Sequence, residues 1–435
     1  MVKIMPPYKT QIVKFDDGER YPILLHSDTG MPLFMPTIYI TTMRRSANRA
    51  FKSLEADLRA IMQLYTWASI EGVDIEERFA QGQFFETSEI EAVVRAARMK
   101  YDELVELHEA SQIKVSNLSV ISHEKFRKLA PKKSSQVQGV TGATRIRHIR
   151  DYIDWLAVMS ISRISSKSDD FQNVETARAH MKKGFTARLP KSKGRNQENN
   201  REGIEDKDVN YILSVLNPES PENPFTDYGA RVRNQLIFLL LYMVGVRRGE
   251  CLGIKIDDIN FQDGTVLIRR RADDPDDPRK DQPNTKTKDR KLPLEGALLD
   301  MLQNYIMNVR RSVSGVRRHK FLFVTHKAGK ACGMPLSQSG YSKIFTTLRE
   351  RVLGIPDGIT GHALRHTWND NFSKLMDGKG TSEEREMQLR SYLMGWSYNS
   401  SMAAHYSKRH IRNKAGEVMV EIQGKALKGI GDEDY

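Results

Sequence analysis

The side chains best suited to chemistry in this sequence are arginines, histidines and tyrosines in the second half of the chain. Moving a phosphoryl group needs a nucleophile that attacks phosphorus, cations that neutralise the nonbridging oxygens, and an acid that protonates the leaving oxygen. Arginine suits the second task because its planar guanidinium binds two oxygens and keeps its charge. Arginines near helix ends, together with a basic hairpin and an isolated tyrosine, therefore indicate this chemistry.

Arg247 is the first candidate, because it follows the apolar run 236–246 and precedes Glu250 by one helical turn. That spacing places both side chains on one helical face, where the carboxylate can orient the guanidinium. A purely structural arginine–glutamate pair fits the same residues. The two interpretations stay open at this point.

His362 and Arg365 form the second candidate, within the sequence His-Ala-Leu-Arg-His-Thr at 362–367. Their i, i+3 spacing puts both on one helical face, where each can donate to the same phosphate. His362 can equally cap a helix or pack in a core. A metal site is not expected, because no further histidine or carboxylate stands at ligand spacing.

Tyr406 is the third candidate, with Trp396 ahead of it. It follows a short polar segment and precedes the basic run 408–410. Such surroundings can bring a phosphate to the phenol and favour its ionised form. Tyr392 and Tyr398 are rival nucleophiles that residue type alone does not exclude.

Lys286 is the fourth candidate and lies in the basic segment Thr-Lys-Thr-Lys-Asp-Arg-Lys. A β-hairpin can insert such a lysine toward the leaving oxygen, where it would act as a general acid. Lys288 is the obvious competitor, and a solvated turn is the simpler alternative. The polar run 273–284 just before this segment predicts a hairpin with a long acidic tip.

In their order and context, these groups resemble the catalytic domain of the tyrosine recombinase (phage integrase) family. The family's G-[LMV]-R-x-x-E pattern is matched at 245–250, and a hairpin lysine within K-T is matched at 286–287. A box of the form H-x-L-R-H-[TS] is matched at 362–367, and a G-[HW] pair ahead of the tyrosine at 395–396. The resemblance covers roughly 205–415, about half of the chain.

The resemblance implies that all these groups act on one DNA phosphate. Tyr406 would attack it, leaving a 3′-phosphotyrosine and a free 5′-hydroxyl. Arg247 and Arg365 would hold the nonbridging oxygens, while His362 and Trp396 would hydrogen-bond or buttress the same phosphate. No cofactor is implied, neither ATP nor a metal, because the covalent bond conserves the energy of the phosphodiester. The implied catalytic residues are Arg247, Lys286, His362, Arg365, Trp396 and Tyr406, with Glu250 and His366 in support.

The charge balance favours nucleic acid as the partner. Lysine and arginine total 68 against 55 acidic residues, which gives a net charge of +13 and a pI near 9.5. Phosphate contacts release counterions, so double-stranded DNA is the expected partner, with a merely basic surface as the alternative. The candidate phosphate contacts outside the catalytic motifs are Arg145, Arg147, Arg150, Lys191, Lys193 and Arg195.

Other features of the sequence argue against a membrane protein and against a secreted protein. The apolar run 236–246 is too short to span a bilayer and predicts a buried helix. The N-terminal sequence lacks the apolar core of a secretory signal. Cys251 and Cys332, with no CxxC pair, argue against a disulfide scaffold or a cysteine zinc site. We expect a cytoplasmic, nucleoid-associated protein without a membrane partner.

The expected fold class is mainly α with a small β-sheet (α+β). The resemblance implies a helical core-binding domain and a mixed catalytic domain that form a clamp around DNA. The expected parts are an N-terminal extension at 1–45, a helical DNA core-binding domain at 46–181, a basic linker at 182–202, a catalytic domain at 203–415 and a tail at 416–435.

The function implied is that of a site-specific DNA recombinase (integrase), serving the integration or excision of a mobile element. The resemblance also implies a homotetramer on two DNA sites, with accessory DNA-bending proteins as further partners. The tail after Tyr406 would dock on a neighbouring subunit or fold back on its own. Two alternatives stay open: a type IB topoisomerase-like enzyme, and a catalytically inactive sequence-specific DNA-binding protein.

Overall fold

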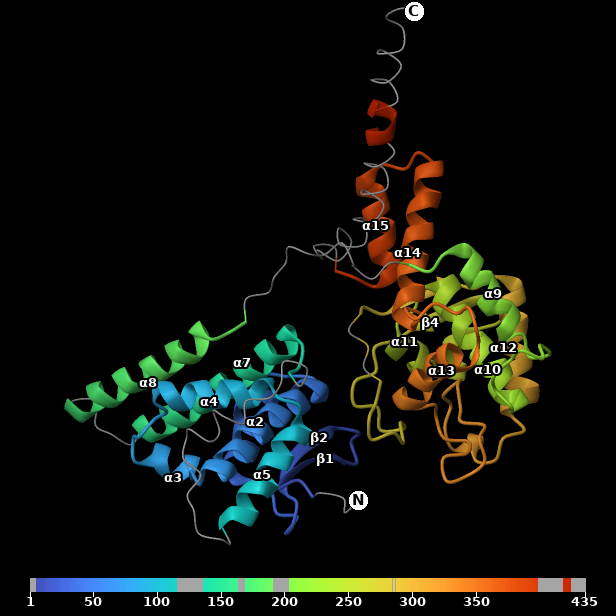
Figure 1. The fold of residues 1–435 in the computed structure, drawn as a ribbon. Coiled ribbons are helices and arrows are strands. Elements are labelled where there is room, and N and C mark those ends of the chain that lie inside the picture. Colours follow the sequence, from blue (N-terminus) through green and yellow to red (C-terminus); the bar gives the residue numbers. More distant parts are fainter. Residues whose placement is uncertain are drawn as a thin grey trace, which may run out of the picture. The chain divides into compact units, whose positions relative to one another are not determined.

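The computed structural model describes residues 5–115, 136–162, 169–190, 203–283, 285, 287–397 and 418–423. Contacts between Cα atoms divide the chain into two compact units, coloured blue to green and green to red in Figure 1. The first unit holds the described residues up to 190 except 16–18, and the second holds residues 16–18 and the described residues from 203 onward. Each unit has a large buried hydrophobic cluster of its own, which is the property of an independent domain.

The first unit is a set of packed helices built on a β-hairpin. β1 (Tyr8–Lys14) pairs antiparallel with β2 (Arg20–His26), with Tyr8 opposite His26. α2 contacts α4, α5, α7 and β2, so it is the central element. The helices are α1 (Phe34–Tyr39), the π-helical η1 (Ile40–Arg45), α2 (Phe51–Glu71), α3 (Ile75–Ala80), α4 (Thr87–Arg98), α5 (Tyr101–Val115), α7 (Gly139–Ile161) and α8 (Asp169–Ala187).

The central position of α2 follows from its sequence. Leu54, Leu58 and Ile61 are buried, as the helical period of the sequence predicts, and Ala60 and Leu64 are buried as well. A helix that is apolar around most of its circumference belongs in the middle of a domain. The helix ends at a glycine with a φ of +69°, the left-handed conformation that commonly terminates helices.

Two boundaries in the first unit differ from those that the sequence predicts. The predicted extension 1–45 contributes Tyr21, Leu24 and Leu33 to the buried core, so its described residues are part of the unit. The predicted linker 182–202 begins inside α8, which continues to Ala187. Apolar residues cause both differences: Phe185 is fully buried and ties this basic stretch to the core.

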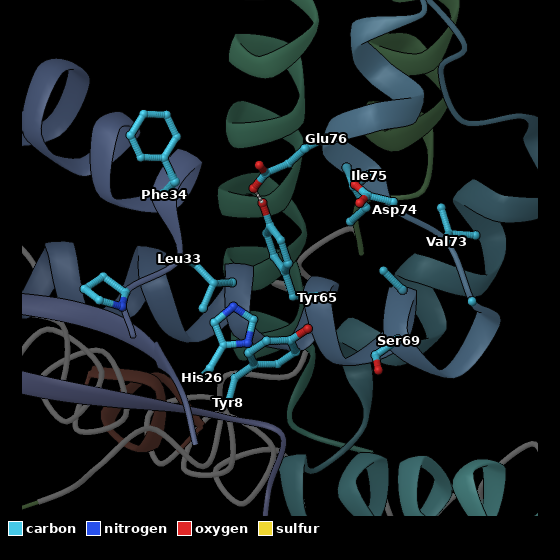
Figure 2. Close-up of a pocket in the computed structure, with 13 residues that line it drawn as sticks. Tyr8, His26, Leu33, Phe34, Tyr65, Ser69, Val73, Asp74, Ile75 and Glu76 are labelled. Carbon is cyan, nitrogen blue, oxygen red and sulfur yellow. Dashed lines mark hydrogen bonds between the residues drawn. The ribbon is translucent and has the colours of Figure 1, made fainter. Parts of the chain in front are cut away.

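A hollow of about 610 Å³ opens in the first unit, between the β-hairpin, the start of α1 and the turn from α2 to α3. Tyr65 extends toward it from α2, and its hydroxyl donates to Glu76 at 2.6 Å, as Figure 2 shows. Tyr8 and His26 line another side, with ring centroids 5.3 Å apart. None of the residues predicted to do chemistry lines this hollow, so the candidate catalytic groups must be sought in the second unit.

The second unit combines helices with a three-stranded antiparallel sheet. The strand order is β3 (Ile259–Asn260), β4 (Thr265–Ile268), β5 (Arg290–Pro293), with Val266 opposite Leu292. The helices are α9 (Asp206–Leu216), α10 (Tyr228–Leu239), the π-helical η3 (Leu240–Val244), α11 (Arg248–Gly253), the 3-10 turn η4 (Ile256–Asp258), α12 (Gly296–Asn304), the π-helical η5 (Tyr305–Arg310), the 3-10 turn η6 (Val316–Arg318), α13 (Gln338–Arg351), α14 (Gly361–Gly378) and α15 (Glu383–Met394). Residues 418–423 are also helical.

The apolar run 236–246 covers the end of α10 and all of η3. Leu236, Leu240 and Leu241 are buried, which confirms the predicted buried helix. No helix in the described part of the chain is long and apolar enough to cross a lipid bilayer. Helices predominate and the strands form small antiparallel sheets, which confirms the predicted fold class. The clamp around DNA stays a prediction.

Residues 269–289, between β4 and β5, are called the insertion below. The sequence predicts a hairpin with a long acidic tip there. The antiparallel pairing of β4 with β5 confirms the hairpin, and its tip is partly buried. Asp274, Asp277 and Gln282 are buried, and the pairing of β4 with β5 stops before the insertion begins. Ion pairs and hydrogen bonds within the second unit account for the burial, because charged groups enter a protein interior only with partners.

Candidate active site

The backbone at the end of η3 fixes the position of Arg247. Gly245 ends that helix with a φ of +69°, and a Cβ there would meet the Trp368 ring at 2.9 Å, so glycine is required. Arg247 then caps α11, and its backbone N–H donates to Glu250 Oε2 at 2.8 Å. The Arg247 side chain is 32% exposed, so its guanidinium reaches solvent from a fixed backbone position.

Glu250 is buried, and its carboxylate is the shared partner of several polar side chains around it. Its carboxylate accepts hydrogen bonds from Arg290 at 2.8 Å and from the Thr287 hydroxyl at 2.6 Å. Arg365 Nη1 lies 4.0 Å from the same carboxylate. Burial raises the pKa of the Glu250 carboxyl, but these three groups, Arg290 first, outweigh burial and lower the pKa to about 2. Glu250 is therefore a permanent anion that binds α11, β5 and α14 together.

Arg365 reaches the same place from α14. It is buried, and its guanidinium donates to the carbonyl of Gly245 and, at 3.4 Å, to the carbonyl of Met394. Arg247 Nη1 also donates to the Met394 carbonyl, again at 3.4 Å. The two arginines that the motifs single out therefore converge on one backbone oxygen at the end of α15.

The two histidines of the box 362–367 lie near the start of α14. Their rings are 4.5 Å apart and edge to face, with His362 exposed and His366 half-buried. His362 and Arg365 both fall within α14, which confirms the predicted helical spacing. Thr360 is the residue that caps the helix, since its hydroxyl accepts the N–H of Ala363. His362 is thus neither a helix cap nor a core histidine.

Trp396 covers Arg365 from the end of α15. The indole is buried, and the Arg365 guanidinium lies 5.7 Å from its ring centroid, within cation–π range. The preceding Gly395 has a φ of +66°, and a Cβ there would lie 2.8 Å from Arg290 Nη1. The Lys288 N–H donates to the Gly395 carbonyl at 3.1 Å. The end of the insertion and the end of α15 therefore pack with no room for a side chain between them.

Several candidates lie outside the described residues: Lys191, Lys193, Arg195, Lys286, Tyr398 and Tyr406. Thr285 and Thr287, on either side of Lys286, are both buried. The rival nucleophile Tyr392 lies on α15, where it is exposed and its hydroxyl is 3.5 Å from the Lys291 carbonyl.

Arg290 belongs to the site although the sequence motifs do not single it out. Its side chain is 1% exposed, it bonds Glu250 through Nη2, and its Nε donates to the Leu393 carbonyl at 2.6 Å. The alternation of β5 puts Arg290 on the same buried face as Leu292. A charged residue at a buried strand position is the feature of the sequence that could have identified it.

The candidate DNA contacts on α7 have different surroundings. Arg147 is exposed. Arg145 Nη1 donates to the Met99 carbonyl at 2.8 Å, and burial lowers its pKa. Arg150 forms an ion pair with Asp151 at 2.8 Å. Arg147 is therefore the most accessible of the three, and DNA contact stays a prediction for all of them.

Taken together, three guanidiniums surround one carboxylate, so positive charge exceeds negative charge among the described groups. The guanidiniums belong to Arg247, Arg290 and Arg365. Fixed guanidiniums of this kind bind phosphate oxygens and stabilise the charge that builds up during phosphoryl transfer. Among the described residues, no group of three histidine, cysteine or carboxylate side chains could hold a metal ion.

The Glu250 carboxylate makes the stability of the second unit depend on pH. Its pKa is lowered from 4.5 to about 2 in the folded protein. A lowered pKa stabilises the fold above the unfolded value, and this contribution is lost as the pH falls from 4.5 toward about 2. The shift corresponds to on the order of 3 kcal/mol. In urea unfolding, Glu250→Gln should be the less stable protein at about pH 6, and the difference should shrink by about pH 3. A difference that stays constant over this range would contradict the assignment.

A sequence model of the phage integrase family matches residues 204–409. The tyrosine recombinase XerD of Halalkalibacterium halodurans is 26% identical over 160 residues, which are 37% of this chain and 45% of that protein. The tyrosine recombinase XerD of Staphylococcus haemolyticus is 26% identical over 205 residues, which are 47% of this chain and 59% of that protein. The chain thus spans about half the length of these curated relatives.

Similar solved structures also come from recombinases. The match to the XerA recombinase has a TM-score of 0.35 and 16% identity, and covers 71% of this chain and 95% of that one. The match to the Tn1549 transposon integrase in complex with transposon right end DNA has a TM-score of 0.36 and 16% identity. It covers 74% of this chain and 94% of that one.

Proposed function

We propose, from the match of residues 204–409 to the phage integrase family, that the chain cuts and rejoins double-stranded DNA at specific sites. The matched region contains every motif named above, from the arginine of 245–250 to Tyr406. We assign the catalytic roles to Arg247, Lys286, His362, Arg365, Trp396 and Tyr406.

The convergence of Arg247 and Arg365 is the observation that carries this proposal. Both guanidiniums donate to the Met394 carbonyl at 3.4 Å, and Glu250 fixes the Arg247 backbone N–H at 2.8 Å. Two cations held side by side repel each other unless an anion joins them. A DNA phosphate offers two nonbridging oxygens, which fit two neighbouring guanidiniums. Glu250 offsets part of the repulsion in the free protein and keeps the pair in place.

In the proposed reaction the phenolic oxygen of Tyr406 forms a bond to phosphorus, and the bond from phosphorus to the 5′ oxygen breaks. The phenolic proton passes to water, and Lys286 gives a proton to the departing 5′ oxygen. The products are a 3′-phosphotyrosine and a 5′-hydroxyl. Attack by a 5′-hydroxyl of another strand reverses these steps and joins the strands, so one phosphate ester replaces another and no energy source is consumed. Arg247 and Arg365 stabilise the negative charge of the transition state.

We further propose that four copies act on two DNA sites and that the reaction integrates or excises a mobile element, with accessory DNA-bending proteins. The family match to phage integrases supports the mobile-element role. The described part of the tail supports assembly: residues 418–423 are helical and expose apolar side chains, which a neighbouring subunit could cover. These side chains are Val418, Met419, Val420 and Ile422.

The experiment that tests the proposal measures strand exchange between two labelled duplexes that carry a target site. Recombinant duplexes should form without ATP or metal, and DNA binding should weaken steeply as salt rises, because phosphate contacts release counterions. Relaxation of supercoiled DNA without exchange would instead support a topoisomerase. Binding with neither cleavage nor exchange would support an inactive DNA-binding protein.

A further inference from the structure

The insertion, residues 269–289, is the least expected part of the second unit. It joins β4 to β5 and contains Lys286, the proposed leaving-group acid. A connection of this length without strands or helices would ordinarily lose much conformational entropy when it is fixed in one position. Asp274, Asp277 and Arg279 are nevertheless buried, which calls for a physical reason.

Arg279 and Asp277 form a buried ion pair at the middle of the insertion. Arg279 Nη2 lies 2.8 Å from Asp277 Oδ2, and the two side chains are 6% and 0% exposed. The Arg279 guanidinium also lies 4.5 Å from the ring centroid of Phe321. A pair this deeply buried costs desolvation, which only good geometry and further hydrogen bonds can offset.

Those further hydrogen bonds connect the insertion to α11 and to the segment just before α13. Arg279 Nη1 donates to the Leu252 carbonyl in α11 at 3.2 Å and to the Leu336 carbonyl just before α13 at 2.8 Å. α11 is the helix that carries Arg247 at its cap and Glu250 in its first turn. Arg279 therefore fixes the insertion to the same short helix that positions the phosphate-binding arginine.

A second set of contacts extends this anchor toward Lys286. The buried Gln282 donates through Nε2 to the Arg271 carbonyl at 3.1 Å, and Arg271 pairs with Asp258 at 2.6 Å. Beyond Lys286, Thr287 bonds Glu250 and the Lys288 N–H bonds the Gly395 carbonyl. The described residues before and after Lys286 are thus both held by hydrogen bonds to the rest of the second unit.

We propose that Arg279 is a positioning residue for the reaction: by holding the insertion against α11 and Leu336, it fixes the segment from which Lys286 protonates the leaving oxygen. This inference rests on the proposed function. It explains why Asp277 lies inside the protein, since Asp277 is the counter-ion that allows Arg279 to be buried. A general acid acts only when it lies within hydrogen-bonding distance of the atom it protonates, so a loosened insertion should slow this one step.

The test uses the neutral double variant Asp277→Asn with Arg279→Met, which removes the anchor without leaving a buried charge unpaired. Single-turnover cleavage is measured on two DNA substrates, one normal and one with sulfur in place of the leaving 5′ oxygen. A thiolate departs without a proton, so that substrate needs no general acid. The variant should cleave the normal substrate about 10- to 100-fold more slowly than the wild type, and the sulfur substrate within about threefold of it.

Arg233→Met is the matched control, because Arg233 is also a buried arginine of the second unit but contacts Asn234 and the Val324 carbonyl. It should lower stability without distinguishing the two substrates. If the double variant does not fold, Gln282→Met removes the anchor nearest Lys286 and should give the same pattern with a smaller effect.

Equal defects on both substrates, or no defect on the normal one, would overturn the role of Arg279. Absence of any covalent adduct with the wild-type protein would instead overturn the proposed function, so the two failures are distinguishable.

Discussion

Replacing Tyr406 with phenylalanine is expected to abolish the covalent protein–DNA adduct and to slow strand cleavage by more than about 10³-fold. The phenyl ring has no oxygen that can bond to phosphorus, while the groups proposed to hold the phosphate are unchanged. DNA binding should therefore persist at the wild-type level. The measurement follows an end-labelled target duplex on a denaturing gel in SDS, where an adduct migrates with the protein, together with a gel-shift measurement of binding.

Tyr392→Phe is the matched control for this variant. Tyr392 is an exposed tyrosine of α15 whose hydroxyl lies 3.5 Å from the Lys291 carbonyl. Its phenol could in principle attack a phosphate as the Tyr406 phenol is proposed to do. The control should retain the adduct. An adduct that persists in Tyr406→Phe but disappears in Tyr392→Phe or Tyr398→Phe would place the nucleophile at the other tyrosine.

The second large effect is expected at Arg290. Arg290→Met removes the closest counter-ion of Glu250, whose side chain is 0% exposed. The buried carboxylate then keeps only its weaker partners, such as Arg365 and the Thr287 hydroxyl. Breaking one side of a buried pair costs about 3–5 kcal/mol, which for a unit of this size lowers Tm by roughly 10 °C. Cleavage should fall as well, because Glu250 also fixes the backbone at Arg247.

The double variant Glu250→Met with Arg290→Met separates these two effects. Replacing both members of a buried pair by apolar residues is far less costly than breaking it. Part of the stability should therefore return, although buried Arg365 loses its nearby carboxylate. Cleavage should stay low, because the Arg247 backbone has lost its carboxylate partner. Thermal unfolding and single-turnover cleavage measure the two properties. A double variant that recovers both would show that Glu250 serves stability alone.

The sequence was sufficient to predict the helical placement of the catalytic box and the buried helix before Arg247. Both depend on local patterns: the i, i+3 spacing of His362 and Arg365 holds within α14, and the apolar run needs only burial. The convergence of Arg247 with Arg365 could not be derived from spacing, because the Met394 carbonyl that both contact comes from a third helix.

The insertion and Arg290 show what local patterns miss. Aspartates in an acidic run are ordinarily solvated, and the burial of Asp277 becomes favourable only because Arg279, its ion-pair partner, is held by tertiary contacts such as that with the Leu336 carbonyl. Arg290 is a charged residue among basic neighbours in the sequence, and its buried partner Glu250 lies on a different element. The prolines, glycines and short β-like runs of 1–45 predict a separate extension, because no local pattern shows that its apolar residues share a core with distant helices.

The most direct test of the central claim is to identify the residue that carries DNA in the trapped intermediate. A nicked target site, which loses its 5′-hydroxyl strand after cleavage, accumulates the adduct, and mass spectrometry of the digested complex locates the attached nucleotide. We expect one modified residue, Tyr406, and loss of the modified peptide when Arg247 or Arg365 is replaced by alanine. Attachment at any other side chain, or full modification of Tyr406 without both arginines, would contradict the account.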